Sequence, residues 1–549
     1  MTSPGTYLRT LRHLRWEQVV LRAAKPLRRP RVDETSAPPK RVRRGPWGLP
    51  AQRRPSLTAP TTWTLLGEAR RLEDIGWDDP SVPLLWRYNQ HYFDDVAAFA
   101  AAERRAWQTV LARRWIAECT PGRGTAWAPY PTSLRIVNWL KWLMADDAPT
   151  GDDVDVIAHS ICVQARWLRD NLETHVLGNH LFVNAKALML AGLFFEGAEA
   201  DGWRATADAI LLREVPEQIL ADGMQYERSP MYHALALEDA LDLVNMARAF
   251  NASLPETVSL SPLVALAPRM HRVLRALTHD DGTLARFNDT ADGIAPDSAE
   301  LARYARALDV ADDDAALPDG ALALMPAGYV RLSRGPAMAI VDVAPVAPDY
   351  LMAHGHADTL AFELALGGRR VIVNGGTSRY GTDDARVRER GTYAHSTVTV
   401  DGTDSSEVWA GFRCGRRARV FDVSVSHDAD ALVVAGAHDG YQHLPGRPTH
   451  RRQWRLSDGE LSVRDEVSPA PAAAIARYHF APGLRVEGAS DDWRVLRVDT
   501  GELVCRVHVE GGRAGRGLSQ WSPSFGVVVA AESLDVEFSG MACSTTWRW

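Results

Sequence analysis

The stretch His354-Gly355-His356-Ala357-Asp358 lies where the sequence changes from a helical pattern to a pattern of strands. In an extended segment side chains alternate between two sides, so His354 and His356 would point the same way. Gly355 between them would let another backbone or a ligand come close. Two imidazoles and a carboxylate within five residues suit a functional site, and the alternative is a pair of structural histidines in a loop.

Before this stretch, apolar residues recur at positions i, i+3, i+4 and i+7, which is the period of an amphipathic α-helix. Joints rich in Gly, Pro and Asp separate the periodic segments, and no fixed sequence repeat is visible. We therefore expect antiparallel helices packed in pairs, as a ring or an arc of hairpins. The expected helices cover residues 99–119, 133–144, 154–172, 179–195, 203–220, 231–250 and 261–277.

After about residue 326, apolar and polar residues alternate in short runs bounded by Gly, Asp and Asn, as in β-strands. Asp458-Gly459 lies between two such runs and is typical of a hairpin turn. The pattern predicts an antiparallel sandwich or roll. The expected strands cover residues 329–334, 338–343, 360–366, 370–373, 396–400, 418–425, 461–467, 503–509 and 525–530.

The length of 549 residues exceeds the size at which one hydrophobic core keeps growing, so at least two domains are expected. We predict a basic arm rich in Pro and Arg over residues 1–60, with one short helix in it. A helical domain over residues 61–318 and a β-domain over residues 319–549 follow. The content of 46% hydrophobic and 24% charged residues is that of a globular protein.

Charge and composition exclude several classes of function. The net charge of -7 gives no general attraction to polyanions, so nucleic acid is not an expected partner, and an acidic ligand would need a local basic cleft. No apolar run is long enough for a membrane span. The missing signal-peptide pattern favours the cytoplasm, although a start site assigned too far downstream would hide a signal for the periplasm or for secretion. Five scattered cysteines fit a reducing compartment.

Two polar clusters in the helical half lie at expected helix starts. Asn179 and His180 follow Gly178, and Tyr232 and His233 follow the capping pair Ser229-Pro230. Helix N-termini favour anions because their backbone amides are unpaired. The alternatives are a capping Asn with a half-exposed His, and an interfacial Tyr bonded to a neighbour.

Two further stretches could contact a sugar polymer. Tyr130, Arg135 and Asn138 combine aromatic and hydrogen-bonding side chains, as a carbohydrate groove requires, although core packing would also explain the aromatic residues. The loop with Arg386, Arg390 and Tyr393 could grip an acidic substrate, because Arg pairs with carboxylates through two parallel hydrogen bonds. A solvated charge run is the alternative for this loop.

Taken together, these motifs resemble the heparinase II/III family of polysaccharide lyases over most of the chain from about residue 60 onward. The stretches 87–93 and 129–139 further resemble the branch of that family associated with bacterial exopolysaccharides. The motifs that carry the resemblance are Gly178-Asn179-His180, Glu227-Arg228-Ser229-Pro230-Met231-Tyr232-His233, His354-Gly355-His356-Ala357-Asp358 and Tyr393-Ala394-His395-Ser396.

The resemblance implies an incomplete (α/α) toroid followed by an antiparallel β-sandwich, with an acidic polysaccharide in the cleft between them. It also implies cleavage next to a uronic acid by β-elimination. On this interpretation Asn179 and His180 neutralise the uronate carboxylate, while Tyr232 and His354 transfer protons. No cofactor is required.

The same resemblance implies a structural divalent metal, Zn or Ca, in some members of the family. Its ligands here would be His356, His395 and Asn374. An Asp is usual at the third position, and an amide is a poorer zinc ligand than a carboxylate. We expect His354 to face Tyr232 and His356 to turn toward His395, which requires a local bend at Gly355.

The chemistry leaves the proton donor and acceptor open. For Tyr232 to act as base, its pKa must fall from about 10 to about 7, which requires roughly 4 kcal/mol of preferential stabilisation of the phenolate. As the acid it needs no such shift, and His180 or His354 would then be the base. We expect Glu227, Arg228 and His233 to contribute to substrate binding.

Three functions compete at this point. The first is a lyase acting on a uronic-acid-containing polymer, either a bacterial exopolysaccharide or a glycosaminoglycan-like chain. The second is a uronate epimerase or another enzyme of polysaccharide assembly, which the missing signal peptide favours. The third is a non-catalytic glycan-binding protein on a lyase fold, suggested by Asn374 and by Ser396, which stands where an Asn is common in the family.

Overall fold

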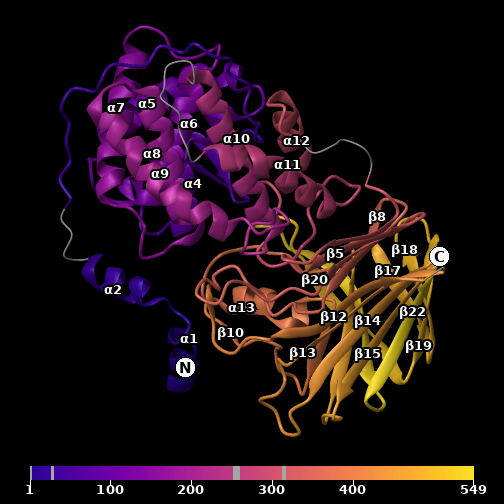
Figure 1. The fold of residues 1–549 in the computed structure, drawn as a ribbon. Coiled ribbons are helices and arrows are strands. Elements are labelled where there is room, and N and C mark those ends of the chain that lie inside the picture. The colour runs from indigo at the N-terminus through magenta and orange to yellow at the C-terminus, as the bar shows by residue number, and fades with distance from the viewer. Residues whose placement is uncertain (1–2, 26–29, 251–259, 312–316, 429) are drawn as a thin grey trace.

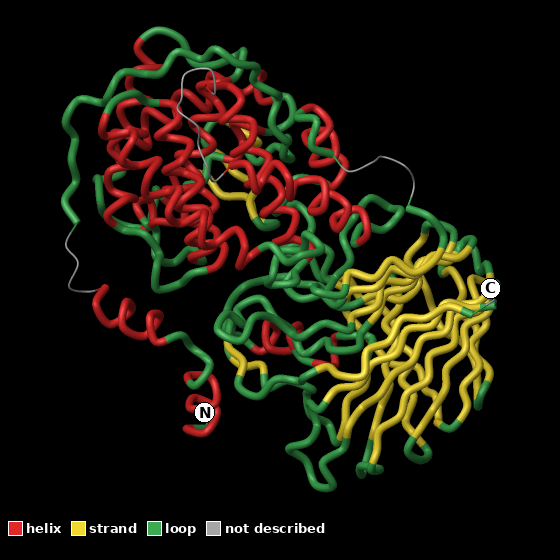
Figure 2. Tube along the Cα trace, in the orientation of Figure 1, coloured by secondary structure: helices red, strands yellow, loops and turns green. Residues whose placement is uncertain are grey.

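The computed structural model describes residues 3–25, 30–250, 260–311, 317–428 and 430–549. A helical N-terminal half is followed by a C-terminal half of antiparallel sheets, and the two lie side by side (Figure 1). The separation of helices from strands along the chain is nearly complete (Figure 2). This confirms the predicted fold class. None of the described helices combines the length and the apolar character that crossing a membrane requires.

The N-terminal arm contains two helices rather than the one expected. α1 (Pro4–Leu11) and α2 (Trp16–Ala24) are separated because Arg15 adopts an extended conformation, with φ of -66° and ψ of 140°. After α2 the chain runs along the helical half, where the amide of Arg41 donates to the carbonyl of Phe194 (2.7 Å).

The arm also contacts both halves through side chains. In α1, Nε of Arg9 donates to Glu407 of the β-half (2.8 Å). In the turn before α2, Arg15 pairs with Glu217 of the helical half, and its guanidinium lies 3.7 Å from the ring centre of Tyr350 of the β-half. Within seven residues the arm therefore touches both halves.

The first element of the body is a three-stranded antiparallel sheet, which the sequence pattern did not predict. It consists of β1 (Leu57–Ala59), β2 (Thr62–Leu65) and β3 (Glu68–Arg71). These strands are only three or four residues long, so no alternating pattern could develop.

The seven predicted helices are all present, with bounds that differ by six residues at most, whereas three shorter helices had no predicted range. The largest difference is at α5, where the predicted start at residue 99 falls in loop and 3₁₀ turns. The helices are α3 (Leu72–Ile75), α4 (Leu84–Gln90), α5 (Arg105–Glu118), α6 (Pro129–Met144), α7 (Asp152–Asp170), α8 (Gly178–Phe194), α9 (Ala198–Gln218), α10 (Pro230–Phe250), α11 (Leu260–Ala276) and α12 (Ser298–Ala307).

α8 is the central helix of this half. Nearly all of its side chains are buried, and it packs against α6, α7, α9 and α10. A helix that is apolar all round requires neighbours on every side. The N-termini of α8 and α10 lie close enough that Asn179, His180 and Tyr232 line one cavity.

The C-terminal half contains two large antiparallel sheets whose inner faces share one apolar core. The first sheet has the order β12-β13-β14-β15-β22-β19-β18-β17, and the second has the order β20-β21-β16-β8-β7-β6-β5-β4, with β9 also paired to β16. The strands of the first sheet are β12 (Val420–His427), β13 (Ala431–His438), β14 (Thr449–Ser457), β15 (Glu460–Ser468), β17 (Leu484–Ala489), β18 (Asp492–Arg497), β19 (Leu503–Glu510) and β22 (Ala542–Arg548).

The strands of the second sheet are β4 (Gly320–Leu324), β5 (Tyr329–Arg334), β6 (Ala337–Asp342), β7 (Phe362–Leu366), β8 (Arg369–Val373), β9 (Val398–Val400), β16 (Ala474–Phe480), β20 (Gly512–Trp521) and β21 (Val529–Phe538). A small pair, β10 (Val408–Trp409) and β11 (Arg413–Cys414), and a short helix, α13 (Asp384–Arg390), lie in the loops.

The strand predictions were mostly right. The hairpin at Asp458-Gly459 is confirmed, because Ser457 pairs with Glu460 across a two-residue turn. The strand expected over residues 525–530 is wrong in its bounds, since β21 begins at Val529. His354 to Asp358 form an irregular loop between β6 and β7 rather than an extended segment.

Candidate active site

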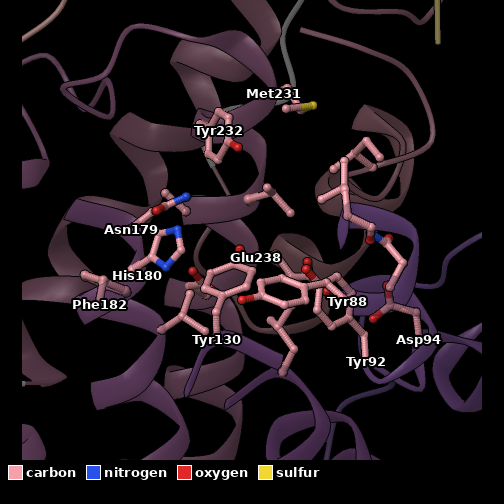
Figure 3. A pocket seen from close by; sticks show the side chains of 18 of the residues that line it. Tyr88, Tyr92, Asp94, Tyr130, Asn179, His180, Phe182, Met231, Tyr232 and Glu238 are labelled. Atoms are coloured by element: carbon pink, nitrogen blue, oxygen red, sulfur yellow. The ribbon is translucent and has the colours of Figure 1, made fainter. Parts of the chain in front are cut away.

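A cavity of about 600 Å³ lies between the helical half and loops of the β-half. The helical side supplies Asn179, His180 and Tyr232, together with an aromatic wall that includes Tyr130 (Figure 3). The loops of the β-half contribute Ala353, His354, Tyr380, Gly381, Phe412 and Phe525.

Asn179 and His180 lie in the first turn of α8, and both line the cavity. Nδ1 of His180 lies 3.1 Å from Oε1 of Glu173, and its ring lies 4.5 Å from that of Tyr130. Burial lowers the pKa of His180, but the Glu173 carboxylate raises it more, so the net shift is upward. Glu173 therefore stabilises the protonated form of His180, which donates hydrogen bonds.

Glu173 is a site residue that the sequence analysis missed. Its backbone amide donates to Oδ1 of Asn184 (2.8 Å), and Nδ2 of Asn184 donates back to its carboxylate (3.3 Å). Burial raises the pKa of Glu173, yet the adjacent His180 lowers it more, and the net shift is downward. The position of Glu173 a few residues before the Gly178-Asn179-His180 motif is the signal that could have revealed its role.

Tyr232 lies in the first turn of α10 because Ser229 caps that helix, with the Tyr232 amide donating to the Ser229 hydroxyl (3.1 Å). Its hydroxyl lies 3.2 Å from that of Tyr380, and its ring centre lies 4.0 Å from that of His354. Burial raises the pKa of Tyr232 well above its usual value, and Tyr380 adds to the effect. The phenol is therefore the stable form.

Asp289 is the residue around which the β-side of the site is organised, and no sequence pattern pointed to it. Its two carboxylate oxygens lie 2.9 Å from Nδ1 of His354 and 2.9 Å from Nε2 of His356. Arg386 binds both oxygens through its two terminal nitrogens. Although burial alone would raise the pKa of Asp289, Arg386 and the two imidazoles hold it well below its usual range.

The ionised Asp289 determines the tautomer of His354. Because the carboxylate accepts from Nδ1, the proton of a neutral His354 lies on Nδ1, and Nε2 is left as an acceptor on the side of Glu227. Asp358 has a different role, since it accepts from the backbone amide of Asn288 (3.0 Å) and so holds the loop that carries Asp289.

The suggested metal ligands do not form a metal site. Nδ1 of His356 lies 3.3 Å from Nε2 of His395, but the other nitrogen of His356 bonds Asp289. Oδ1 of Asn374 already accepts from the amide of Ser396 (3.0 Å). The described residues contain no group of three or more His, Cys, Asp or Glu that could hold a metal ion. The donor set therefore does not fit the group. His356 and His395 contact each other behind Asp289, whereas Nδ1 of His395 and Nδ2 of Asn374 have no hydrogen-bond partner among the described residues.

Three of the predicted binding arginines are structural, which corrects the sequence analysis. Arg135 is fully buried with its guanidinium 3.7 Å from the ring centre of Trp115, and burial lowers its pKa to about 9. Arg386 is fully engaged with Asp289. Arg390 is buried and donates to backbone carbonyls, among them that of Gly355 (2.9 Å).

Four further predicted contacts lie outside the cavity lining. His233 bonds the backbone amide of Gln225 and the carbonyl of Met270, and Arg228 donates to the carbonyl of Ala327. Glu227 is buried with its carboxylate 3.8 Å from Nε2 of His354. Tyr393 is exposed on the β-half, where Arg477 covers its ring. Tyr130 and Asn138 do line the cavity.

The fold and the cavity place the chain in the class of proteins that join a helical N-terminal domain to C-terminal antiparallel sheets. A crystal structure of heparinase III matches with a TM-score of 0.65 and 18% identity, over 84% of this chain and 76% of that one. A chondroitin AC lyase of Streptomyces coelicolor matches with a TM-score of 0.52 and 12% identity, over 90% of this chain and 77% of that one.

The chain belongs to the heparinase II/III-like family. The model of the heparinase II/III N-terminus matches residues 89–314, and that of the heparinase II/III-like C-terminal domain matches residues 318–549. A heparin-sulfate lyase of Pedobacter heparinus is 29% identical over 259 residues, which cover 42% of this chain and 38% of that protein. The alignment thus spans well under half of this relative.

Proposed function

We propose that this protein is a polysaccharide lyase that cleaves a uronic-acid-containing polymer by β-elimination, with an acidic bacterial exopolysaccharide as the finer proposal. The observation that carries it is the close pairing of Tyr232 with His354 in a cavity that Asn179 and His180 also line. Family membership supports the same reaction class.

The first requirement is to stabilise negative charge on the uronate. Removing the proton next to a carboxylate places charge on that carboxylate, and donors aimed at it lower the barrier. Asn179 offers its amide at the N-terminus of α8, and the Glu173 carboxylate raises the pKa of His180 and so stabilises its protonated form. Loss of one such donor typically costs about two to three orders of magnitude in rate.

The second requirement is the transfer of two protons. Nε2 of His354 takes the C5 proton, the electron pair forms the C4–C5 double bond, and the bond from C4 to the glycosidic oxygen breaks. Tyr232 donates its proton to that leaving oxygen. We assign the acid to Tyr232 because burial raises its pKa and disfavours the phenolate that a base would require. Asp289 orients His354 as base through Nδ1.

The test is to incubate the protein with a panel of uronate polymers, including acidic bacterial exopolysaccharides, and to follow ultraviolet absorbance of the unsaturated product. We expect product with at least one polymer, and none with a Tyr232→Phe variant of the same fold. Absence of product across the whole panel would contradict the proposal. Deuterium uptake at C5 without chain cleavage would instead identify an epimerase.

A further inference from the structure

The end of the cavity away from Tyr232 is aromatic and acidic. Tyr130 lies between His180 on one side and Tyr88, Tyr92 and Asp94 on the other (Figure 3), with the rings of Tyr130 and Tyr92 6.0 Å apart. Asp94 is half-buried, and its Oδ1 accepts from Nδ2 of Asn138 (2.7 Å).

Two tyrosine hydroxyls at this end have no hydrogen-bond partner in the part of the chain that the structure describes. Tyr92 is only 8% exposed, yet its hydroxyl is bonded to none of the described residues, and the same holds for the hydroxyl of Tyr130. Neither oxygen is among the fully buried polar atoms that lack a partner, so both hydroxyls are open to the cavity, where a ligand can reach them. These two groups therefore point to a ligand with hydroxyl or amine groups of its own, such as a sugar ring.

Every cation of the cavity floor is already neutralised by a carboxylate. Lys141 bonds Glu238 (3.2 Å) and Asp242 (2.5 Å), and Lys186 bonds Asp239 (2.7 Å) and Asp242 (2.6 Å). The third cation, Arg53, pairs with Glu238 at 2.5 Å. Among the described residues that line the cavity, no other Lys or Arg is present.

The balance of charge at this end is therefore negative or zero. Three cations face the three carboxylates that bind them, and Asp94 is an additional carboxylate without an ion pair among the described residues. Burial raises the pKa of Asp239. Even with Asp239 protonated, three cations would face three carboxylates, and no positive charge would be left for an anionic substituent.

We propose that this end of the cavity is a subsite for a hexosamine that carries a free, protonated amine and no sulfate. The inference rests on the proposed function, because it assigns the sugar next to the cleaved uronate. An ammonium group offers three donors to Asp94 and to the two free hydroxyls, and tyrosine faces attract cations. A sulfate there would meet Asp94 at close range in a poorly solvated cavity, where like charges repel strongly.

The test compares oligosaccharides of alternating glucuronate and glucosamine that differ only at the glucosamine nitrogen, which is a free amine, acetylated or sulfated. Binding to the Tyr232→Phe protein is measured by calorimetry, so that cleavage plays no part. We expect the free amine to bind most tightly and the sulfated form least, with at least about a tenfold ratio of Kd between them, which is about 1.4 kcal/mol.

A matched pair of variants localises the effect. Asp94→Asn keeps the shape of the side chain and an acceptor for Asn138, and it should bring the three Kd values to within about threefold of one another, because the surplus charge is gone. Asp74→Asn removes the same charge from the exposed helix α3 and should leave the order intact.

Three results would overturn the inference: sulfated chains that bind as tightly as the amine form, no binding of any form, or an unchanged order in Asp94→Asn. Failure of the proposed function looks different. The order of binding would hold, while the unsubstituted protein would give no unsaturated product from the amine form.

Discussion

The two ends of the cavity differ in which charged groups face the ligand and which lie behind them. At the reactive end the carboxylates of Asp289 and Glu173 stand behind imidazoles, and the imidazoles face the cavity. At the far end Lys141 and Lys186 are held in ion pairs in the floor, and Asp94 faces the cavity. At the reactive end the imidazoles meet the ligand, and this arrangement serves proton transfer. At the far end the carboxylate of Asp94 meets the ligand, and this arrangement discriminates between charged substituents of the sugar.

Of the variants considered, Tyr232→Phe should reduce the catalytic activity most. Without the hydroxyl, the leaving oxygen has no proton donor, and general-acid catalysis is worth about 10²- to 10⁴-fold. We expect kcat to fall by about 10³-fold, while binding at the far end keeps its order. Initial rates of unsaturated product measure the effect, and a thermal melt serves as the control for folding. Retention of a tenth of the activity would refute the assignment of the acid.

The Asp289→Asn variant should distinguish two roles of Asp289, which are neutralising the charge of Arg386 and orienting the ring of His354. The change leaves Arg386 buried without its anion, which costs about 3–5 kcal/mol of unfolding free energy. His354 also loses its orientation, so activity should fall as well. Denaturant titration measures the first effect, and product formation the second.

A second change in the same cluster serves as the control. Adding Arg386→Met to Asp289→Asn should recover most of the stability, because the unpaired charge is removed, but not the activity. Recovery of both would show that Asp289 has no role beyond pairing with Arg386.

Glu173→Gln should shift the pH dependence rather than abolish activity. Glu173 is the group that raises the pKa of His180, so the protonated donor persists to a higher pH in the natural protein. With Gln, the alkaline fall of kcat/KM should move to lower pH, by about one unit for each 1.4 kcal/mol lost. A pH–rate profile on one polymer measures this, with Asp74→Asn as the matched control. An unmoved alkaline limb would remove His180 from carboxylate binding.

Arg135→Met should have the smallest effect on the reaction. The side chain lies in the core against Trp115 and has no access to the cavity, so KM should change by less than about twofold, within the scatter of distant substitutions. A larger rise in KM would restore Arg135 as a binding residue, as the sequence first suggested.

The helices and the helix-borne site residues could be predicted from the sequence because both follow local rules. Helical periodicity located α6 to α11 closely, and the cap at Ser229 explained why Tyr232 is presented at an N-terminus. The small sheet over residues 57–71 could not be predicted in the same way, since its strands are too short for a period.

The β-side of the site was less predictable for a physical reason. Asp289 acquires its role from contacts with His354 and Arg386, which are 65 and 97 residues away in sequence. Likewise, sequence does not tell a buried arginine from a binding one, as Arg135 and Arg390 show. A charged residue can be assigned to substrate binding only when the burial of its side chain and its ion-pair partners are known.

The arm has a mechanical consequence for the cavity. Arg9 is tied to Glu407 on the β-half, and Arg15 is tied to Glu217 on the helical half. The six residue steps between them can extend to about 20 Å at most. This short tether limits how far the two halves can part while both ion pairs last. The side chains of both ion pairs are partly buried, so the tether restrains the opening of the cavity that lies between the two halves.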